Sequence, residues 1–316
     1  MTLVELRGKG LRVRHVEKLN TGINSLVYKL KDKSGTYYIL KIYPYHCVKD
    51  RRDRQNTEKL FLDHLNIIDV NNVARIVEYN KELNWTLFEC IDGIQPNHLG
   101  EGLAKAAVEF LSMINKLSVD KTVFANKAAS EAGKSINYLS ENLKFRLDSL
   151  LIVEHNSSLE EKAIGWLRKT IEPRIKNTIE IAKSKMSETQ WRESTVFSTL
   201  SPSDVGIHNS IQNSGGYFFV DFEYAGRDDL AKFIGDWLHH PDHRMTNSFQ
   251  KTFLESIDNN RNLPSSGLSR YEDIKDIIVL KWCLIMLNPL LSNNLTKSRL
   301  DKTIGYYEAQ NYNNKF

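Results

Sequence analysis

The spacing of hydrophobic residues changes once along this chain of 316 residues, and the change falls at residues 92–97. Before it, short runs rich in Val, Ile, Tyr and Phe are separated by turn residues, which predicts β-strands. After it, apolar residues recur every three to four positions over long stretches, which predicts helices. Gly93 and Pro96 interrupt both patterns. We therefore expect an α+β protein with a small lobe over residues 1–92 and a larger, mostly helical lobe over residues 93–316.

The predicted small lobe is an antiparallel sheet with one helix. Its helix is expected at residues 53–65, and its strands at residues 13–18, 25–31, 36–42, 75–79 and 85–91. The segment Asp32-Lys33-Ser34-Gly35 has the composition of a hairpin turn. The larger lobe should contain a short strand at residues 217–220 and helices at residues 103–117, 130–152, 159–185 and 271–291.

Composition argues against nucleic acid and membranes as partners. A net charge of +4 is small for this length and gives no strong case for nucleic acid as a partner. Three widely spaced cysteines, Cys47, Cys90 and Cys283, suggest reduced thiols in a cytoplasmic protein. The first residues lack the apolar core of a signal peptide, and the apolar segment 277–291 is too short to span a bilayer comfortably. We expect a cytoplasmic protein without a membrane partner, and nothing in the sequence selects an oligomeric state.

The polar residues around position 204 carry the chemistry. Asp204 is followed by Asn209, and Asp221 stands at the end of the predicted strand 217–220. An aspartate can accept the proton of a hydroxyl nucleophile, while an asparagine and a second aspartate can bind magnesium through oxygen. Earlier in the chain, Lys41 lies on a predicted strand and can hold phosphates. Together these residues provide what phosphoryl transfer requires.

Five segments, in this order, resemble the aminoglycoside phosphotransferase and choline kinase family of kinase-like small-molecule kinases. They are residues 19–28 (LNTGINSLVY), 39–42 (ILKI), 58–65 (EKLFLDHL), 204–209 (DVGIHN) and 220–226 (VDFEYAG), the last followed by Asp229. Each motif alone is weak, whereas the ordered set is fairly specific. The resemblance covers roughly residues 15–240.

The resemblance implies a bilobal protein-kinase-like fold with ATP between the lobes and Mg²⁺ as cofactor. It makes Asp204 the catalytic base and Asn209 and Asp221 the magnesium ligands. Nucleotide contacts would come from the phosphate-binding Lys41, from Glu58 that orients it, from the loop residues Thr21, Gly22, Asn24 and Ser25, and from the backbone of Glu89 and Ile91 beside adenine. The activity implied is phosphorylation of a hydroxyl on a small molecule.

The acceptor stays open between a sugar or related metabolite, an amino alcohol and an aminoglycoside. The small net charge favours the sugar over a polycationic antibiotic. A protein-kinase role is disfavoured, because the short stretch from Asp221 to Asp229 leaves no room for a long activation segment.

Two departures from the family pattern motivate a second hypothesis. Pro202 and Ser203 stand where the family usually has His and Gly, and His208 replaces a residue that is commonly small. The alternative is a pseudokinase that binds nucleotide or a partner without transferring phosphate. Taken singly, Asp204 could also be a turn residue and Asp221 a strand-end residue.

Two further clusters favour structural interpretations. His239, His240 and His243 invite a metal site, but adjacent histidines point to different faces of a helix and Pro241 ends it, so we interpret them as a helix terminus. The basic run at residues 49–54 alternates with acids, which favours a solvated helix start over a nucleic-acid contact.

Overall fold

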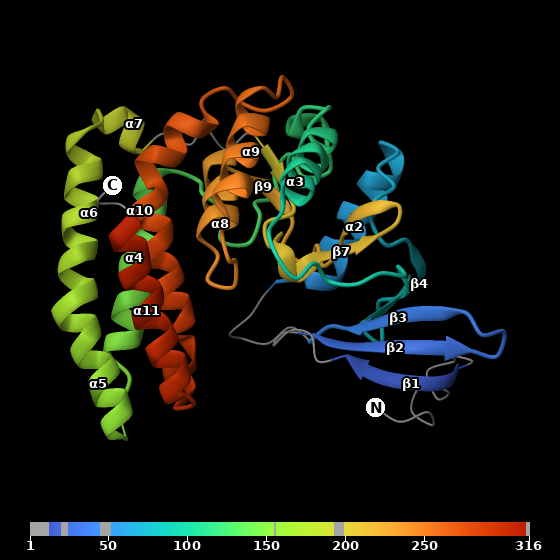
Figure 1. Cartoon of the computed structure of the whole chain (residues 1–316), viewed down its shortest axis with the longest axis horizontal. Helices are drawn as coiled ribbons and strands as arrows, with labels where there is room; N and C mark the ends of the chain where they lie inside the picture. Colours follow the sequence, from blue (N-terminus) through green and yellow to red (C-terminus); the bar gives the residue numbers. More distant parts are fainter. Residues whose placement is uncertain (1–12, 20–24, 45–51, 155, 193–198, 314–316) are drawn as a thin grey trace.

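The computed structural model describes residues 13–19, 25–44, 52–154, 156–192 and 199–313, and it has two lobes (Figure 1). The small lobe is a five-stranded antiparallel sheet in the order β1-β2-β3-β5-β4. Its strands are β1 (Val13–Leu19), β2 (Leu26–Asp32), β3 (Tyr37–Ile42), β4 (Ile76–Asn80) and β5 (Trp85–Glu89), and its helix is α2 (Arg54–Ile67). The predicted α+β, bilobal architecture is confirmed.

The hairpin between β2 and β3 sets the register of the sheet. Gly35 has φ +96°, a conformation that glycine adopts without strain. The Asp32 carboxylate accepts hydrogen bonds from Ser34 Oγ at 2.7 Å and from the Thr36 amide at 2.9 Å. The resulting register places Lys41 between strands, beside Val27 on β2 and Thr86 on β5.

The apolar side chains of the small lobe belong to two separate clusters. One face forms a small apolar cluster of Tyr28, Leu30, Leu40, Trp85 and Leu87. Helix α2 instead sends Phe61 and Leu65, both fully buried, into the large core of the helical lobe. Burial of such side chains stabilises a protein by roughly 1.5–3 kcal/mol each. Helix α2 therefore joins the lobes physically.

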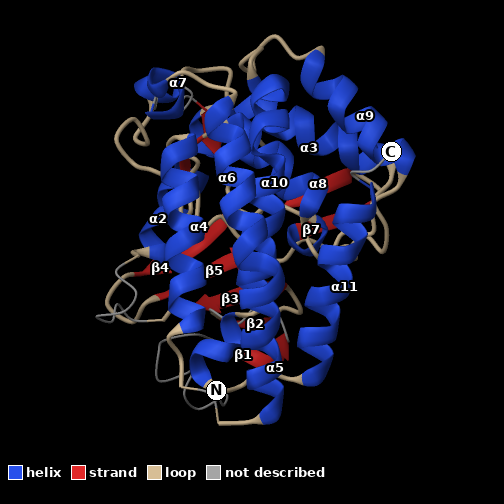
Figure 2. Cartoon of the chain, turned by 90° about the vertical axis from the view of Figure 1, so that its left-hand side faces the viewer, coloured by secondary structure: helices blue, strands red, loops and turns tan. Residues whose placement is uncertain are grey.

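The large lobe is built around α10 (Gly267–Met286), which packs against α4, α6, α8 and α11. The other helices are α3 (Glu101–Ile114), α4 (Ile136–Leu151), α5 (Ser158–Trp166), α6 (Glu172–Ser184), α7 (Glu188–Arg192), α8 (Leu230–His239), α9 (Asn247–Asp258) and α11 (Lys297–Asn313). The long helices α4, α5, α6, α10 and α11 form an outer bundle, seen face-on in Figure 2. No helix in the described ranges is long and apolar enough to cross a membrane.

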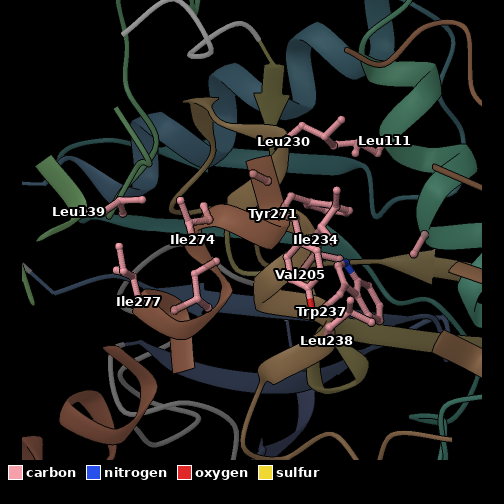
Figure 3. Close-up of a cluster of buried hydrophobic side chains, with 14 of the residues drawn as sticks. Leu111, Leu139, Val205, Leu230, Ile234, Trp237, Leu238, Tyr271, Ile274 and Ile277 are labelled. Carbon is pink, nitrogen blue, oxygen red and sulfur yellow. The ribbon is translucent and has the colours of Figure 1, made fainter. Parts of the chain in front are cut away.

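The core between α8 and α10 supports the predicted catalytic loop (Figure 3). Val205, from that loop, is 4% exposed and lies in one cluster with Trp237 of α8 and Ile274 of α10. Gly235 permits close packing of the two helices, because a Cβ there would lie 2.2 Å from Ile278 Cδ1. This packing of α8 and α10 supports the backbone of the predicted catalytic loop.

Two small sheets hold the polar segments at the junction of the lobes. One pairs β6 (Thr199–Ser201) with β9 (Gly226–Asp228), and the other pairs β7 (Ser210–Asn213) with β8 (Gly216–Phe219). An isolated bridge from Phe219 to Val73 connects β8 to the stretch between α2 and β4, and a bridge from Gln212 to Ile94 connects β7 to the chain that follows β5.

Several helix boundaries differ from those expected. The helix expected at residues 130–152 begins only at Ile136, because Ser135 caps it and Ser130 pairs through its amide with the Tyr224 carbonyl. The helix expected at residues 159–185 contains a π-turn at Leu167–Ile171 beside Pro173, whose missing N–H interrupts regular helical bonding.

The last predicted helix also has different limits. The expected helix at residues 271–291 begins four residues earlier, at Gly267, and its α-helical part ends at Met286. Pro289 follows within a 3-10 turn, Asn288–Ser292. The helix that Pro241 was predicted to end has His239 as its last residue, two positions before the proline.

Candidate active site

Lys41 lies at the meeting point of the two lobes. Its neighbour Leu40 is buried in the sheet cluster, and the alternation of β3 turns Lys41 to the opposite face. The ammonium is 2.7 Å from Glu58 Oε2 and 2.6 Å from Asp221 Oδ1. Burial alone would lower the pKa of Lys41, but the adjacent carboxylates, Asp221 foremost, raise it well above its ordinary value.

Glu58 is held by more than the lysine. It is 3% exposed and accepts hydrogen bonds from Tyr43 Oη at 2.6 Å and from the Phe222 amide at 3.0 Å. The last bond joins α2 to the segment that carries Asp221. The structure therefore brings together Lys41, Glu58 and Asp221, which are separated by up to 180 positions in the sequence.

Asp221 follows β8 in an unusual backbone conformation. Its φ is +69°, in the left-handed region, where aspartate is among the better-tolerated residues other than glycine. The preceding Val220 amide donates to the Asn209 carbonyl at 3.0 Å, which fixes the turn. Burial, together with the nearby Glu58 and Glu223 charges, outweighs the attraction of Lys41 and raises the pKa of Asp221 to about 6.

Glu223 and Arg54 complete the charged cluster, and sequence reasoning did not assign either a role. Glu223 Oε2 is 3.0 Å from Lys41 Nζ, and Glu223 Oε1 is 2.6 Å from Arg54 Nη1. Lys41 and Arg54 together lower the pKa of Glu223 despite its burial. In the sequence, the only signal for Glu223 was its position two residues after Asp221.

Arg54 corrects the interpretation of the basic run. Residues 49–51 lie outside the described part of the chain, but Arg54 is 5% exposed, so the start of the helix is not simply solvated. Its guanidinium contacts Glu223 and the Tyr224 hydroxyl. A periodicity argument could not find this, because the partners lie 169 and 170 residues away.

Asn209 and Asp204 lie on the same loop but face different surroundings. Asn209, in the 3-10 turn Ile207–Asn209, donates from Nδ2 to the Asp204 carbonyl at 2.6 Å. Among the described residues nothing donates to its Oδ1. The Asp204 carboxylate is 3.4 Å from His208 Nε2. Burial would raise the pKa of Asp204, but this contact with His208 lowers it below its ordinary value.

The Pro202-Ser203 departure leaves the loop formed. Ser203 has φ +68°, the conformation for which glycine is best suited. Its hydroxyl donates to the Ser130 carbonyl at 3.0 Å, and its amide donates to Ser201 Oγ at 3.0 Å. These bonds hold a serine where the family pattern usually has glycine.

A cavity of about 380 Å³ adjoins the charged cluster. Its walls come from both lobes, with Val27 and Ile39 from the sheet and Ile211 from β7. Residues Lys41, Glu58, Asn209 and Asp221 line it, as do the predicted contact residues Glu89 and Ile91. Asp204 does not line it. Of the predicted loop residues, Thr21, Gly22 and Asn24 lie outside the described residues, and Ser25 Oγ donates to Glu223 Oε2 at 2.9 Å.

The donor set at this cavity suits a hard divalent cation. The Asn209 amide oxygen and the Asp221 carboxylate line the same space, and one oxygen of each of Glu58, Asp221 and Glu223 lies within 4.8 Å of the others. Magnesium prefers such oxygen ligands. Lys41, already inside this cluster, supplies the positive charge that a phosphate would meet.

Comparison with solved structures shows that the chain has the bilobal fold of kinases that act on small molecules. It superposes on a spectinomycin phosphotransferase solved with ADP and spectinomycin with a TM-score of 0.65, at 15% identity, over 97% of this chain and 93% of that one. An ethanolamine kinase from Plasmodium vivax gives a TM-score of 0.63, at 14% identity, over 97% and 85%.

A third similar structure, a choline/ethanolamine kinase family protein from Mesorhizobium loti, gives a TM-score of 0.62, at 14% identity, over 98% of this chain and 93% of that one. No protein-family model matches the sequence, and no curated protein matches it. At these identities the likeness establishes the fold, which is that of the family that the motifs resemble.

Proposed function

We propose that this protein is a phosphotransferase that uses ATP and magnesium to phosphorylate a hydroxyl group of a small molecule. One observation carries the proposal: the Lys41 ammonium is held by Glu58 and Asp221 beside a cavity lined by both lobes. A structural ion pair would need neither the cavity nor the amide oxygen of Asn209, which accepts no hydrogen bond from the residues that the structure describes. The nucleotides in similar structures, ADP in the spectinomycin phosphotransferase and AMP-PNP in an amicoumacin kinase, support it.

We assign the apolar part of the cavity to adenine. Val27, Ile39 and Ile211 offer apolar surface on two sides of it. The Glu89 amide already donates to the Arg75 carbonyl at 2.9 Å. We assign the Glu89 carbonyl and the Ile91 amide to the adenine edge. The chain then divides into lobes at residues 92 and 93, just beyond this segment.

We assign the polar end of the cavity to the phosphates. Lys41 would position them, with Glu58 fixing the lysine side chain, and Asn209 and Asp221 would hold magnesium. Bound magnesium supplies neutralisation of the charge on the phosphate oxygens. Asp204, kept ionised by its contact with His208, would accept the proton of the acceptor hydroxyl.

Two substitutions test this division of roles. Asp221→Ala should remove magnesium-supported turnover, by about 10²-fold or more, because a phosphate-charge stabiliser is lost. Asp204→Asn should leave nucleotide affinity within about twofold while slowing transfer by about 10²–10⁴-fold. Nucleotide binding by calorimetry and ATP consumption with a panel of hydroxyl metabolites measure both. Near-normal activity of Asp221→Ala would refute the assignment.

The second candidate function is a pseudokinase that binds nucleotide without transferring phosphate. Pro202-Ser203 before Asp204 favours it, as does the position of the Asp204 carboxylate outside the cavity lining. Thermal shifts with ATP and magnesium, followed by the acceptor panel, separate the two candidates. Strong stabilisation by nucleotide with no phosphorylated product from any acceptor would select the pseudokinase.

The acceptor panel should contain three classes. The similar structures include enzymes named for ethanolamine and for spectinomycin, which are an amino alcohol and an aminocyclitol antibiotic. A sugar or related metabolite is the third class, favoured by the small net charge. Mass detection of a phosphorylated product identifies the class directly.

A further inference from the structure

Three histidines form a cluster beside the predicted catalytic loop, and the proposed phosphotransferase roles use only one of them, His208, through its contact with Asp204. His208 comes from the loop, His240 follows the last residue of α8, and His243 lies three residues further on. One ring nitrogen of each lies within 4.8 Å of the other two. The centroids of the His208 and His240 rings, and of the His240 and His243 rings, are 4.7 Å apart. His239 belongs elsewhere, because it bonds Gln310 and Tyr271.

The hydrogen bonds of His243 determine which of its nitrogens has a lone pair. Nδ1 is 2.7 Å from the Trp237 carbonyl, which only accepts, so Nδ1 carries the proton. Nε2 therefore carries the lone pair, which accepts a hydrogen bond of 3.2 Å from the Ile207 amide, and a metal ion bound at Nε2 would replace that bond. A histidine whose other nitrogen donates to a carbonyl is the usual arrangement of a metal ligand.

His208 has the matching arrangement with a carboxylate. Its Nε2 faces Asp204 Oδ1 at 3.4 Å, and its Nδ1 is buried without a hydrogen-bond partner among the described residues. A buried polar nitrogen without a hydrogen-bond partner is energetically unfavourable, so it calls for an explanation. A ligand that binds Nδ1 would provide one.

Gly206 keeps the space between two of these nitrogens open. A Cβ at this position would lie 2.7 Å from His243 Nε2 and 2.9 Å from His208 Nδ1. Both nitrogens therefore face the same small volume over the Gly206 α-carbon. Any other residue would place a Cβ in the gap between these two nitrogens.

His240 supplies the third ring from the side of α10. It packs edge-on against Trp282, with ring centroids 4.6 Å apart. Its Nδ1 accepts a hydrogen bond of 3.2 Å from the Asp242 amide. A metal ion bound at that nitrogen would replace this bond, and the neutral imidazole is the form that binds metals.

We propose that His208, His240 and His243 form a three-histidine site for a transition-metal ion of the zinc class, with the fourth position open to water. Zinc–nitrogen bonds of about 2.0–2.1 Å put tetrahedral ligands about 3.4 Å apart. The three nitrogens must then approach by up to about 1.4 Å, a movement within reach of side-chain rotation. Imidazole ligands select zinc, cobalt or nickel over magnesium, which prefers oxygen, so the site is chemically distinct from the proposed nucleotide–magnesium site.

Cobalt binding to the EDTA-treated whole chain tests the proposal, because tetrahedral Co²⁺ absorbs visible light far more strongly than octahedral Co²⁺. We expect one tetrahedral Co²⁺ per chain, displaced by Zn²⁺. His240→Gln should weaken binding by about 100-fold or more, since removing a ligand exceeds the 10–100-fold effect of losing an outer-shell partner. The matched control is His239→Gln, which removes the adjacent histidine and should leave affinity unchanged.

A second variant keeps the ligands and removes only the space. Gly206→Ala retains all three histidines and should abolish cobalt binding, with folding checked by circular dichroism. The proposal is overturned by a weak octahedral spectrum, by no binding below millimolar cobalt, or by equal affinity in His240→Gln and the parent chain. None of these results depends on phosphotransferase activity.

Discussion

At the residue scale, the site is a cluster of buried and half-buried charges. Lys41 alone among three carboxylates would leave a net negative cluster, and Arg54, the second positive charge, reduces this excess without cancelling it. Alternation along a strand was enough to place Lys41 opposite Leu40, because that property is local. The pairing of Arg54 with Glu223 joins residues 169 positions apart, and no local pattern reports it.

Arg54→Met should lower the free energy of unfolding by about 3–5 kcal/mol, because it leaves the buried Glu223 carboxylate with less compensation. Urea unfolding measures the change. The control is Arg75→Met, at an exposed arginine whose guanidinium donates to Asn71 Oδ1 at 2.9 Å, where the change should stay within about 0.5 kcal/mol. Equal effects of the two substitutions would show that the buried pair of Arg54 and Glu223 does not contribute to the free energy of unfolding.

At the element scale, five helices, α2, α4, α5, α8 and α9, begin where a side chain accepts a hydrogen bond from an amide of the first turn. Asp229 caps α8 by accepting from the Ala231 amide at 3.0 Å, and it also binds Arg270 of α10 at 2.7 and 3.1 Å. This aspartate, part of the motif that resembles the kinase family, therefore orders the helix that ends at the histidine cluster. Ser157 caps the peripheral α5 through a single bond of 3.3 Å to the Glu160 amide.

Asp229→Ala should destabilise the protein by about 3 kcal/mol or more, since it removes a cap and leaves Arg270 unpaired. Ser157→Ala should cost about 1 kcal/mol, the usual value for a cap alone. The loss of stability in Asp229→Asn should lie between these two values, because asparagine keeps the cap and loses the ion pair. Thermal and urea unfolding rank the three variants, and a smaller effect at Asp229 than at Ser157 would contradict the argument.

At the scale of the whole molecule, buried histidines make the fold sensitive to acid. His240 and His243 have folded pKa values of about 4 and 3, against about 6.5 in an unfolded chain. Because these values are lowered, the unfolded state binds more protons below pH 6.5, and stability falls as the pH falls. Asp221, with its pKa raised to about 6, and His208, whose pKa its contact with Asp204 raises, act in the opposite direction. Burial lowers the pKa values of His64 and His239, which adds to the effect of His240 and His243.

The free energy of unfolding should therefore decrease by on the order of 2 kcal/mol between pH 6.5 and pH 5. Urea titrations in EDTA at several pH values measure it. His243→Gln should flatten this dependence, whereas His98→Gln, at an exposed site, should leave it unchanged. Stability that rises toward pH 5 would contradict the assignment of neutral buried histidines.

Local sequence patterns were sufficient for the architecture. Residue spacing and turn composition are properties of neighbouring residues, so they located the strands, the hairpin at Asp32–Gly35 and the change from sheet to helices. They failed where a distant contact decided the outcome. The helix expected from residue 130 starts at Ile136, since residues before it pair with the segment around Arg227.

The sequence by itself determined the order of the elements and the candidate residues Lys41, Glu58, Asp204, Asn209 and Asp221, because periodicity and motif order are written along the chain. Only the tertiary structure decided their neighbours. It added Glu223 and Arg54 to the charged cluster and replaced His239 by His208 in the histidine cluster. The physical reason is that buried charges and lone pairs are satisfied by whichever groups packing brings within bonding distance, and packing joins residues that sequence spacing does not relate.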